Sequence, residues 1–176
     1  MKIIEYPGAK TAPYKTVLDD IAAHSNNIFN SGDVVTKVHE TLHGINSDIR
    51  NKYHCPGFYI LQDKAILVDE PACKLSDVAK EIRPAERGPN YQLYLIQQQK
   101  DWNGQPTYVL DEWSAYRAGS ICAAETGVRV EDAKNHFIEF TRYAWALVRL
   151  APELRPFMKY FEQNKDLPDY CTATYL

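Results

Sequence analysis

The residues from His39 to His43 read H-E-x-x-H, and the residues around them repeat with the period of an α-helix. Residues four apart lie one above the other on a helix, so His39 and His43 project from one face and could bind a single metal ion. Glu40 lies about 100° further round the helix, where it could accept a proton from a metal-bound water. We therefore expect the chain to fold around a helix that carries a metal site.

An apolar stripe beside this motif predicts a helix over about residues 33–52. The stripe consists of Val34, Val38, Leu42, Ile45 and Ile49. On a helical wheel Asn46 and Arg50 fall within about 40° of His39, on the same polar face. The helix would therefore turn one face to the core and present the histidines to a cleft. Ser31 or Asp33 could cap its start.

The composition is that of a globular protein with one hydrophobic core. The chain has 176 residues, of which 45% are apolar and 24% are charged. No run approaches the roughly 20 apolar residues of a membrane span, and the net charge of -3 provides no basic surface for nucleic acid. The start has no apolar leader, which favours a cytoplasmic protein, or a secreted one whose leader has been removed. The chain has no internal repeat and no long linker, so we expect a single domain over 1–176. The sequence leaves its oligomeric state open.

In the first half of the chain, short elements are predicted on either side of the motif helix. They are an extended arm (1–14), a short helix (15–24), a β-hairpin (58–61 and 65–69) and a helix capped by Ser76 (76–83). The hairpin strand near the motif helix could pair with an extended peptide substrate, or it could be purely structural.

In the second half, residues 91–98 predict a strand, with a helix as the alternative, and residues 107–110 predict a returning strand. Small residues should let a helix over 111–125 lie close to a neighbour. A long amphipathic helix is expected over 130–150 and a short one over 153–164, separated at Pro152, and the tail beyond them looks irregular. The expected fold class is α+β: a mostly helical domain with a small antiparallel sheet beside the motif helix.

Two histidines are too few for a catalytic zinc ion, which takes three protein ligands and keeps one position open. We expect Glu112 to be the third ligand, because it begins the helix of small residues. Asp111 is the nearest alternative, and Glu125 and His136 follow. The expected cofactor is one Zn²⁺ ion.

HETLH followed by a helical glutamate resembles the zincin metallopeptidases, and within them the gluzincin branch, whose third ligand is a glutamate. The resemblance covers residues 33–52 and 107–125. It implies a zincin-like fold. It also implies roles for four residues, with Glu40 as general base and His39, His43 and Glu112 as metal ligands.

The chain departs from related patterns at three positions. Asn46 and Ile49 argue against the three-histidine extension HExxHxxGxxH. Tyr116 stands four residues after Glu112, where many gluzincins carry an acidic residue, so the surroundings of the ligand must differ.

These residues predict a zinc metallopeptidase that hydrolyses a peptide or amide bond in a peptide or protein substrate. Tyr116 is the expected donor to the developing oxyanion, with Tyr108 and His54 as alternatives. Two other functions stay open. One is a binding or effector-like domain whose motif holds metal without catalysis or is vestigial, and the other is a zinc hydrolase that acts on a different bond.

The four cysteines leave the redox compartment open. Cys55 and Cys73 bracket the predicted hairpin and could form a disulfide, which would place the protein in an oxidising compartment. Cys122 is expected to be buried in a helix, and Cys171 lies near the end of the chain. None has C-x-x-C spacing, which argues against a thiolate zinc site.

Overall fold

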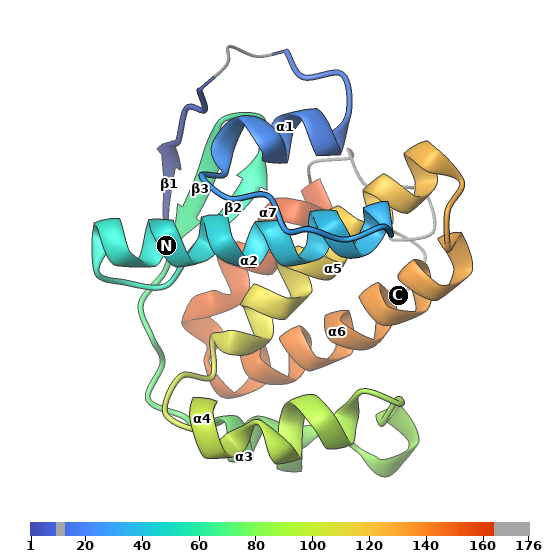
Figure 1. Ribbon diagram of the computed structural model, residues 1–176. Coiled ribbons are helices and arrows are strands. Elements are labelled where there is room, and N and C mark those ends of the chain that lie inside the picture. The colour runs from blue at the N-terminus through green and yellow to red at the C-terminus, as the bar shows by residue number, and fades with distance from the viewer. Residues whose placement is uncertain (10–12, 164–176) are drawn as a thin grey trace.

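The computed structural model describes residues 1–9 and 13–163, and it shows a mostly helical α+β fold (Figure 1). The elements in chain order are β1 (Lys2–Glu5), α1 (Val17–His24), α2 (Val34–Tyr53), β2 (Gly57–Leu61), β3 (Lys64–Leu67), α3 (Leu75–Glu81), η1 (Pro84–Glu86), η2 (Gln92–Gln97), α4 (Gln99–Trp102), α5 (Tyr108–Thr126), α6 (Val130–Leu150), η3 (Pro152–Leu154) and α7 (Arg155–Gln163). The α+β class is confirmed. The irregular tail expected at the end of the chain lies outside the described residues.

Helix α2 is the predicted motif helix, and it packs against β2 on one side and α5 on another. Four residues of its apolar stripe are at most 1% exposed, namely Val38, Leu42, Ile45 and Ile49. Asp33 caps the helix, because its Oδ1 accepts the N–H of Val35 at 3.1 Å. The helix ends where His54 adopts the left-handed conformation, with φ of 56°.

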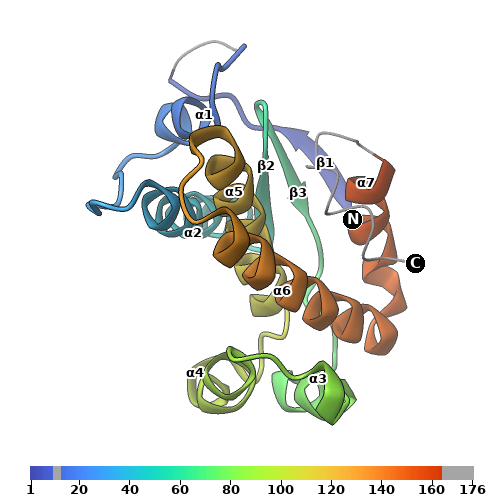
Figure 2. The same ribbon diagram turned by 90° about the vertical axis from the view of Figure 1, so that its right-hand side faces the viewer.

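The sheet has three antiparallel strands in the order β1-β3-β2. The predicted hairpin is confirmed as β2 and β3, and the N-terminal arm supplies the third strand. Side chains alternate between two cores: Phe58 and Ile66 contact the side of α6 and α7, whereas Tyr59 and Ala65 contact the side of α1 and α2. Figure 2 shows the sheet between α2 and α7. The sheet thus supports the apolar side of α2, in a core that α5 shares.

The outer edge of β2 is occupied near the motif helix. The backbone N–H of Tyr59 donates to Oδ1 of Asn46 on α2 at 2.8 Å. A peptide strand added at this edge would need that same donor. The structural interpretation of the hairpin is therefore favoured over peptide pairing at this position.

Two segments predicted as strands are helical, and for residues 91–98 this was the stated alternative. Residues 91–98 lie in the π-helical η2 and its ends, and residues 107–110 fall at the start of α5. The carboxylate of Glu70 accepts the N–H of Thr107 at 2.8 Å and also its hydroxyl, so a distant residue caps the start of α5. The predicted cap of α3 is also wrong, since that helix begins after Lys74, whose N–H donates to Asp77.

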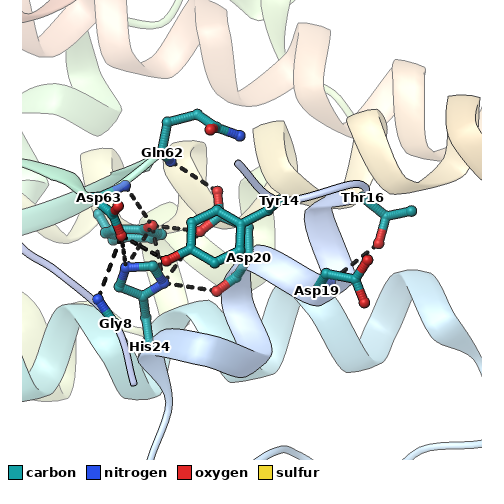
Figure 3. A network of polar contacts seen from close by, with 9 residues as sticks. Gly8, Tyr14, Thr16, Asp19, Asp20, His24, Gln62 and Asp63 are labelled. Atoms are coloured by element: carbon teal, nitrogen blue, oxygen red, sulfur yellow. Dashed lines mark hydrogen bonds and ion pairs between the residues drawn. The ribbon is translucent and has the colours of Figure 1, made fainter. Parts of the chain in front are cut away.

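A buried polar network joins the N-terminal arm, α1 and the β2–β3 turn (Figure 3). Both ring nitrogens of His24 face acceptors, with Nδ1 2.7 Å from the Asp20 carbonyl oxygen and Nε2 2.8 Å from Oδ1 of Asp63. The hydroxyl of Tyr14 donates to the same oxygen of Asp63 at 2.7 Å, and that of Tyr59 donates to the Asp20 carboxylate.

This network also stabilises the β2–β3 turn, whose backbone conformation is unfavourable. Leu61, Gln62 and Asp63 have positive φ values of 76°, 55° and 59°. Residues other than glycine rarely adopt this backbone conformation. The N–H of Gln62 donates to Asp20 at 2.8 Å, and that of Asp63 donates to the Tyr59 hydroxyl at 3.1 Å. The two bonds compensate for the cost of the left-handed turn.

Cys55, Cys73 and Cys122 are free thiols, so the disulfide considered between Cys55 and Cys73 is not formed. Cys122 is buried in α5 as expected, and Cys171 lies outside the described residues. Within the described part of the chain, no helix combines the length and the apolar character that crossing a bilayer requires.

Candidate metal centre

Helices α2 and α5 bring three metal-binding side chains together: His39, His43 and Glu112. The Nε2 atoms of His39 and His43 lie 3.1 Å apart, and Oε2 of Glu112 lies 3.7 and 3.5 Å from them. Ligand atoms at about 2.0–2.1 Å from a tetrahedral ion lie about 3.3–3.4 Å from one another. The three atoms therefore have the spacing that the ligands of one small ion require.

The small residues of α5 allow this approach, as the sequence predicted. Ala115 and Ala118 are almost fully buried and belong to the core that α2 shares. A Cβ added to Gly119 would lie 3.5 Å from Val35 and 3.9 Å from the Cβ of His39. Short side chains at these positions let α5 present Glu112 to the two histidines.

One oxygen of Glu112 is buried and unsatisfied. The residue is 6% exposed, and its Oε2 has no hydrogen-bond partner among the described residues. A buried carboxylate oxygen without a donor is costly, because the group has lost its water and gained nothing in return. A cation between this oxygen and the two histidines would satisfy it, so the residues present fit a metal ion.

Asp111 supports the site through His43 and is not one of the three clustered donors. Its Oδ2 lies 3.1 Å from Nδ1 of His43, and its Oδ1 accepts from Nδ2 of Asn46 at 2.6 Å. If Nδ1 of His43 donates to this carboxylate, Nε2 keeps its lone pair for a metal. The nearest alternative to Glu112 as third ligand thus contacts the far side of the imidazole.

The pKa shifts of the two histidines have opposite signs. Burial, followed by the charge of His43, lowers the pKa of His39 to about 3, so His39 is neutral and its Nε2 can be a ligand. Burial alone would lower the pKa of His43, but Asp111 and Glu112 outweigh it and hold that pKa well above its usual value. The site favours a positive charge between these carboxylates. A metal ion that binds here must displace the proton of His43.

The other candidate ligands lie elsewhere. Glu125 is near the far end of α5, where its carboxylate accepts the N–H of Val17 at 3.1 Å. His136 is half-buried beside Tyr116, with ring centroids 5.2 Å apart, and does not join the three clustered donors.

Two hollows meet at the metal-binding cluster. The α6-side hollow has a volume of about 140 Å³ and is lined by Val35, Thr36, His39, Glu40, Tyr94, Tyr116, Gly119, Arg129, Asp132, Ala133 and His136. The α4-side hollow has a volume of about 370 Å³ and is lined by His39, Glu40, His43, Ser47, Arg50, Tyr94, Trp102, Tyr108, Asp111 and Glu112. His39, Glu40 and Tyr94 line both, so the two hollows are neighbours at these side chains.

Of the predicted oxyanion donors, Tyr116 lies beside the cluster. Its ring packs on that of His39 with centroids 4.3 Å apart, and its hydroxyl is 3.0 Å from the hydroxyl of Tyr94. Tyr108 lines the α4-side hollow, and the exposed His54 ends α2 and is not part of either lining. Tyr94 was not predicted as a site residue, because it lies in residues 91–98, for which a strand was preferred over a helix.

No protein-family model matches the chain, and comparisons with curated proteins and with solved structures find no match either. The function must therefore be argued from the residues of the site.

Proposed function

We propose that the protein is a zinc-dependent metallopeptidase of the zincin type, which hydrolyses a peptide or amide bond. One observation carries the proposal: the Nε2 atoms of His39 and His43 form a triangle with Oε2 of Glu112, a buried oxygen that lacks a hydrogen bond in the described chain. Two histidines and one glutamate are a common ligand set of catalytic zinc, and this set leaves a position open. The ligand set agrees with the gluzincin branch.

A zinc ion held by these residues would supply Lewis-acid chemistry, which makes water acidic enough to ionise near neutral pH. Glu40 follows His39 directly and faces both hollows. Its side chain is exposed, so it can reach a substrate in the cleft. In the proposed mechanism Glu40 accepts the proton of the attacking water and delivers it to the leaving nitrogen.

In the proposed mechanism Tyr116 and Tyr94 stabilise the oxyanion together. Their hydroxyls share one hydrogen bond but carry two protons, so one O–H remains available to a substrate oxygen. Burial, with the bond to Tyr94, raises the pKa of Tyr116, so its hydroxyl stays protonated at neutral pH. In the proposed mechanism Tyr116 donates to the oxyanion, directly or through Tyr94.

The open surroundings favour catalysis over a structural role. Structural zinc sites are closed by four protein ligands. Here three donors cluster among the described residues, and all three line the α4-side hollow.

The test combines metal content with hydrolysis. We expect about one zinc per purified chain by elemental analysis, and cleavage of randomised peptides detected by mass spectrometry. Glu40→Gln should keep the zinc and lose about 10²–10⁴-fold in rate, because it removes the general base. The matched control Glu131→Gln, exposed on α6, should keep both properties.

Other outcomes would separate the alternatives. Zinc without Glu40-dependent hydrolysis would indicate a metal-binding domain, and protein that never takes up zinc would contradict the proposal. In the same assay Tyr116→Phe should lower kcat about 100-fold with unchanged zinc content. An unchanged kcat would remove Tyr116 from the mechanism.

A further inference from the structure

Among the residues that the structure describes, Arg50 is the one Lys or Arg side chain that lines the α4-side hollow. It lies seven residues after His43 on α2, which places it about 10 Å further along the helix. The two side chains share one face of α2, because seven residues make nearly two full turns. A substrate that extends from the metal-binding cluster into this hollow would therefore meet the guanidinium.

The charge of Arg50 is not neutralised by direct contact. In the described part of the chain it has no ion pair within 4.0 Å, and Glu70 and Asp111 interact with its charge only at longer range. Both of these carboxylates already have closer donors, Thr107 for Glu70 and Asn46 for Asp111. The guanidinium thus keeps its hydrogen-bond donors for a ligand.

Arg50 lies against an aromatic stack in the α4-side hollow. The guanidinium carbon lies 5.9 Å from the ring centroid of Trp102, and this ring stacks on Tyr108 with centroids 5.0 Å apart and planes at 4°. Tyr108 in turn lines the α4-side hollow together with Glu112. The stack fixes the guanidinium while leaving its edge accessible, since Arg50 is only partly buried.

We infer that the α4-side hollow binds a carboxylate of the substrate through Arg50, so that the substrates are peptides with a negative charge close to the scissile bond. The planar guanidinium can form two parallel hydrogen bonds with a carboxylate. A distance of about 10 Å corresponds to about three residues of extended peptide. Both the C-terminal carboxylate and an Asp or Glu side chain supply this chemistry. The inference rests on the proposed function and deepens it.

Binding can test this without catalysis. Zinc-loaded protein with Glu40→Gln is mixed with three pools of randomised N-acetylated pentapeptides: free acids without Asp or Glu, the same peptides as C-terminal amides, and amides with one Glu. We expect one carboxylate pool to bind about 10–100-fold more tightly than the neutral amides. The pool that is favoured identifies the source of the carboxylate.

Variants assign the preference to Arg50. Adding Arg50→Gln should remove it, and Arg50→Lys should retain part of it, because lysine keeps the charge and loses the two-pronged geometry. The matched control Lys52→Gln removes a positive charge from an exposed position on α2 and should change nothing. Circular dichroism confirms that each variant is folded.

Three results would overturn the inference: equal binding of all pools, binding of none, or a carboxylate preference that survives Arg50→Gln. The last would place the carboxylate on the metal or another group. These results are distinct from failure of the proposed function, which is measured by zinc content and by Glu40-dependent hydrolysis. If the protein cleaves neutral and acidic peptides equally well, the peptidase function is supported and the carboxylate-binding role of Arg50 is contradicted.

Discussion

Asp111 holds the imidazole of His43 through Nδ1, and Asn46 holds Asp111 in turn. Asn46 also accepts the N–H of Tyr59, so the orientation of His43 is tied to the backbone of β2. Such outer contacts fix the tautomer of a ligand histidine and raise its basicity. The polar face of α2, which was predicted to face a cleft, therefore includes Asn46, which helps to orient the imidazole of His43 through Asp111.

Replacing Asp111 should weaken metal binding without removing a ligand. We expect Asp111→Asn to lower zinc affinity about 10–100-fold, because Asn is neutral and no longer fixes the imidazole. Competition with a chelating dye measures the affinity. Asp101→Asn, on the exposed part of α4, is the control. Equal affinities of Asp111→Asn and wild type would show that Asp111 has no role in orienting His43.

At the residue scale, the sequence predicted what depends on local spacing. His39, Glu40 and His43 follow from the helical period alone. Glu112 was proposed from the packing of small residues, and the structure brings it to the two histidines. Tyr94 depends on the path of a π-helical segment that no short-range pattern specified.

At the scale of elements, errors occurred where distant residues determine local structure. Thr107 to Leu110 have the composition of a strand, but they begin α5. The carboxylate that caps this start belongs to Glu70, 37 residues earlier, and the sequence contains no local sign of that contact. The amphipathic helix over 130–150 was predicted with its observed bounds, because its apolar face is long and regular.

The network that links α1 to the β2–β3 turn should make stability depend on pH. Burial alone would lower the pKa of His24, but its hydrogen bonds and charge interactions with Asp20 and Asp63 raise it above the usual value of about 6.5. The protonated form is therefore stabilised by folding. Its contribution is full below the unfolded pKa of about 6.5 and is lost as the pH rises through the folded pKa.

We therefore expect His24→Asn to destabilise the protein more at pH 6 than at pH 9. Urea unfolding of metal-free protein at both values measures the difference. His54→Asn is the control, since His54 is exposed and asparagine tolerates its left-handed backbone. A destabilisation by His24→Asn that is the same at both pH values would mean that the charge of His24 does not stabilise the fold.

At the scale of the whole molecule, the candidate metal site joins two helices. The residues that could bind the ion come from α2 and α5, which also pack against each other. An ion that binds this site only when the protein is folded stabilises the folded state of the entire domain.

Zinc at about 1,000 times its dissociation constant should add about 4 kcal/mol to the free energy of unfolding. For a chain of this length that corresponds to a rise in Tm of about 8–16 °C. Differential scanning calorimetry with zinc and with a chelator measures the shift. Glu112→Gln should lose most of it and Glu131→Gln should lose none. A shift that persists in Glu112→Gln would place the stabilising ion elsewhere.

The most direct test of the central claim is anomalous diffraction at the zinc edge from zinc-loaded crystals. We expect one peak per chain, at about 2.0–2.2 Å from Nε2 of His39, Nε2 of His43 and an oxygen of Glu112. A peak at other residues, or no peak between these three side chains, would contradict the assignment of a metal centre to α2 and α5.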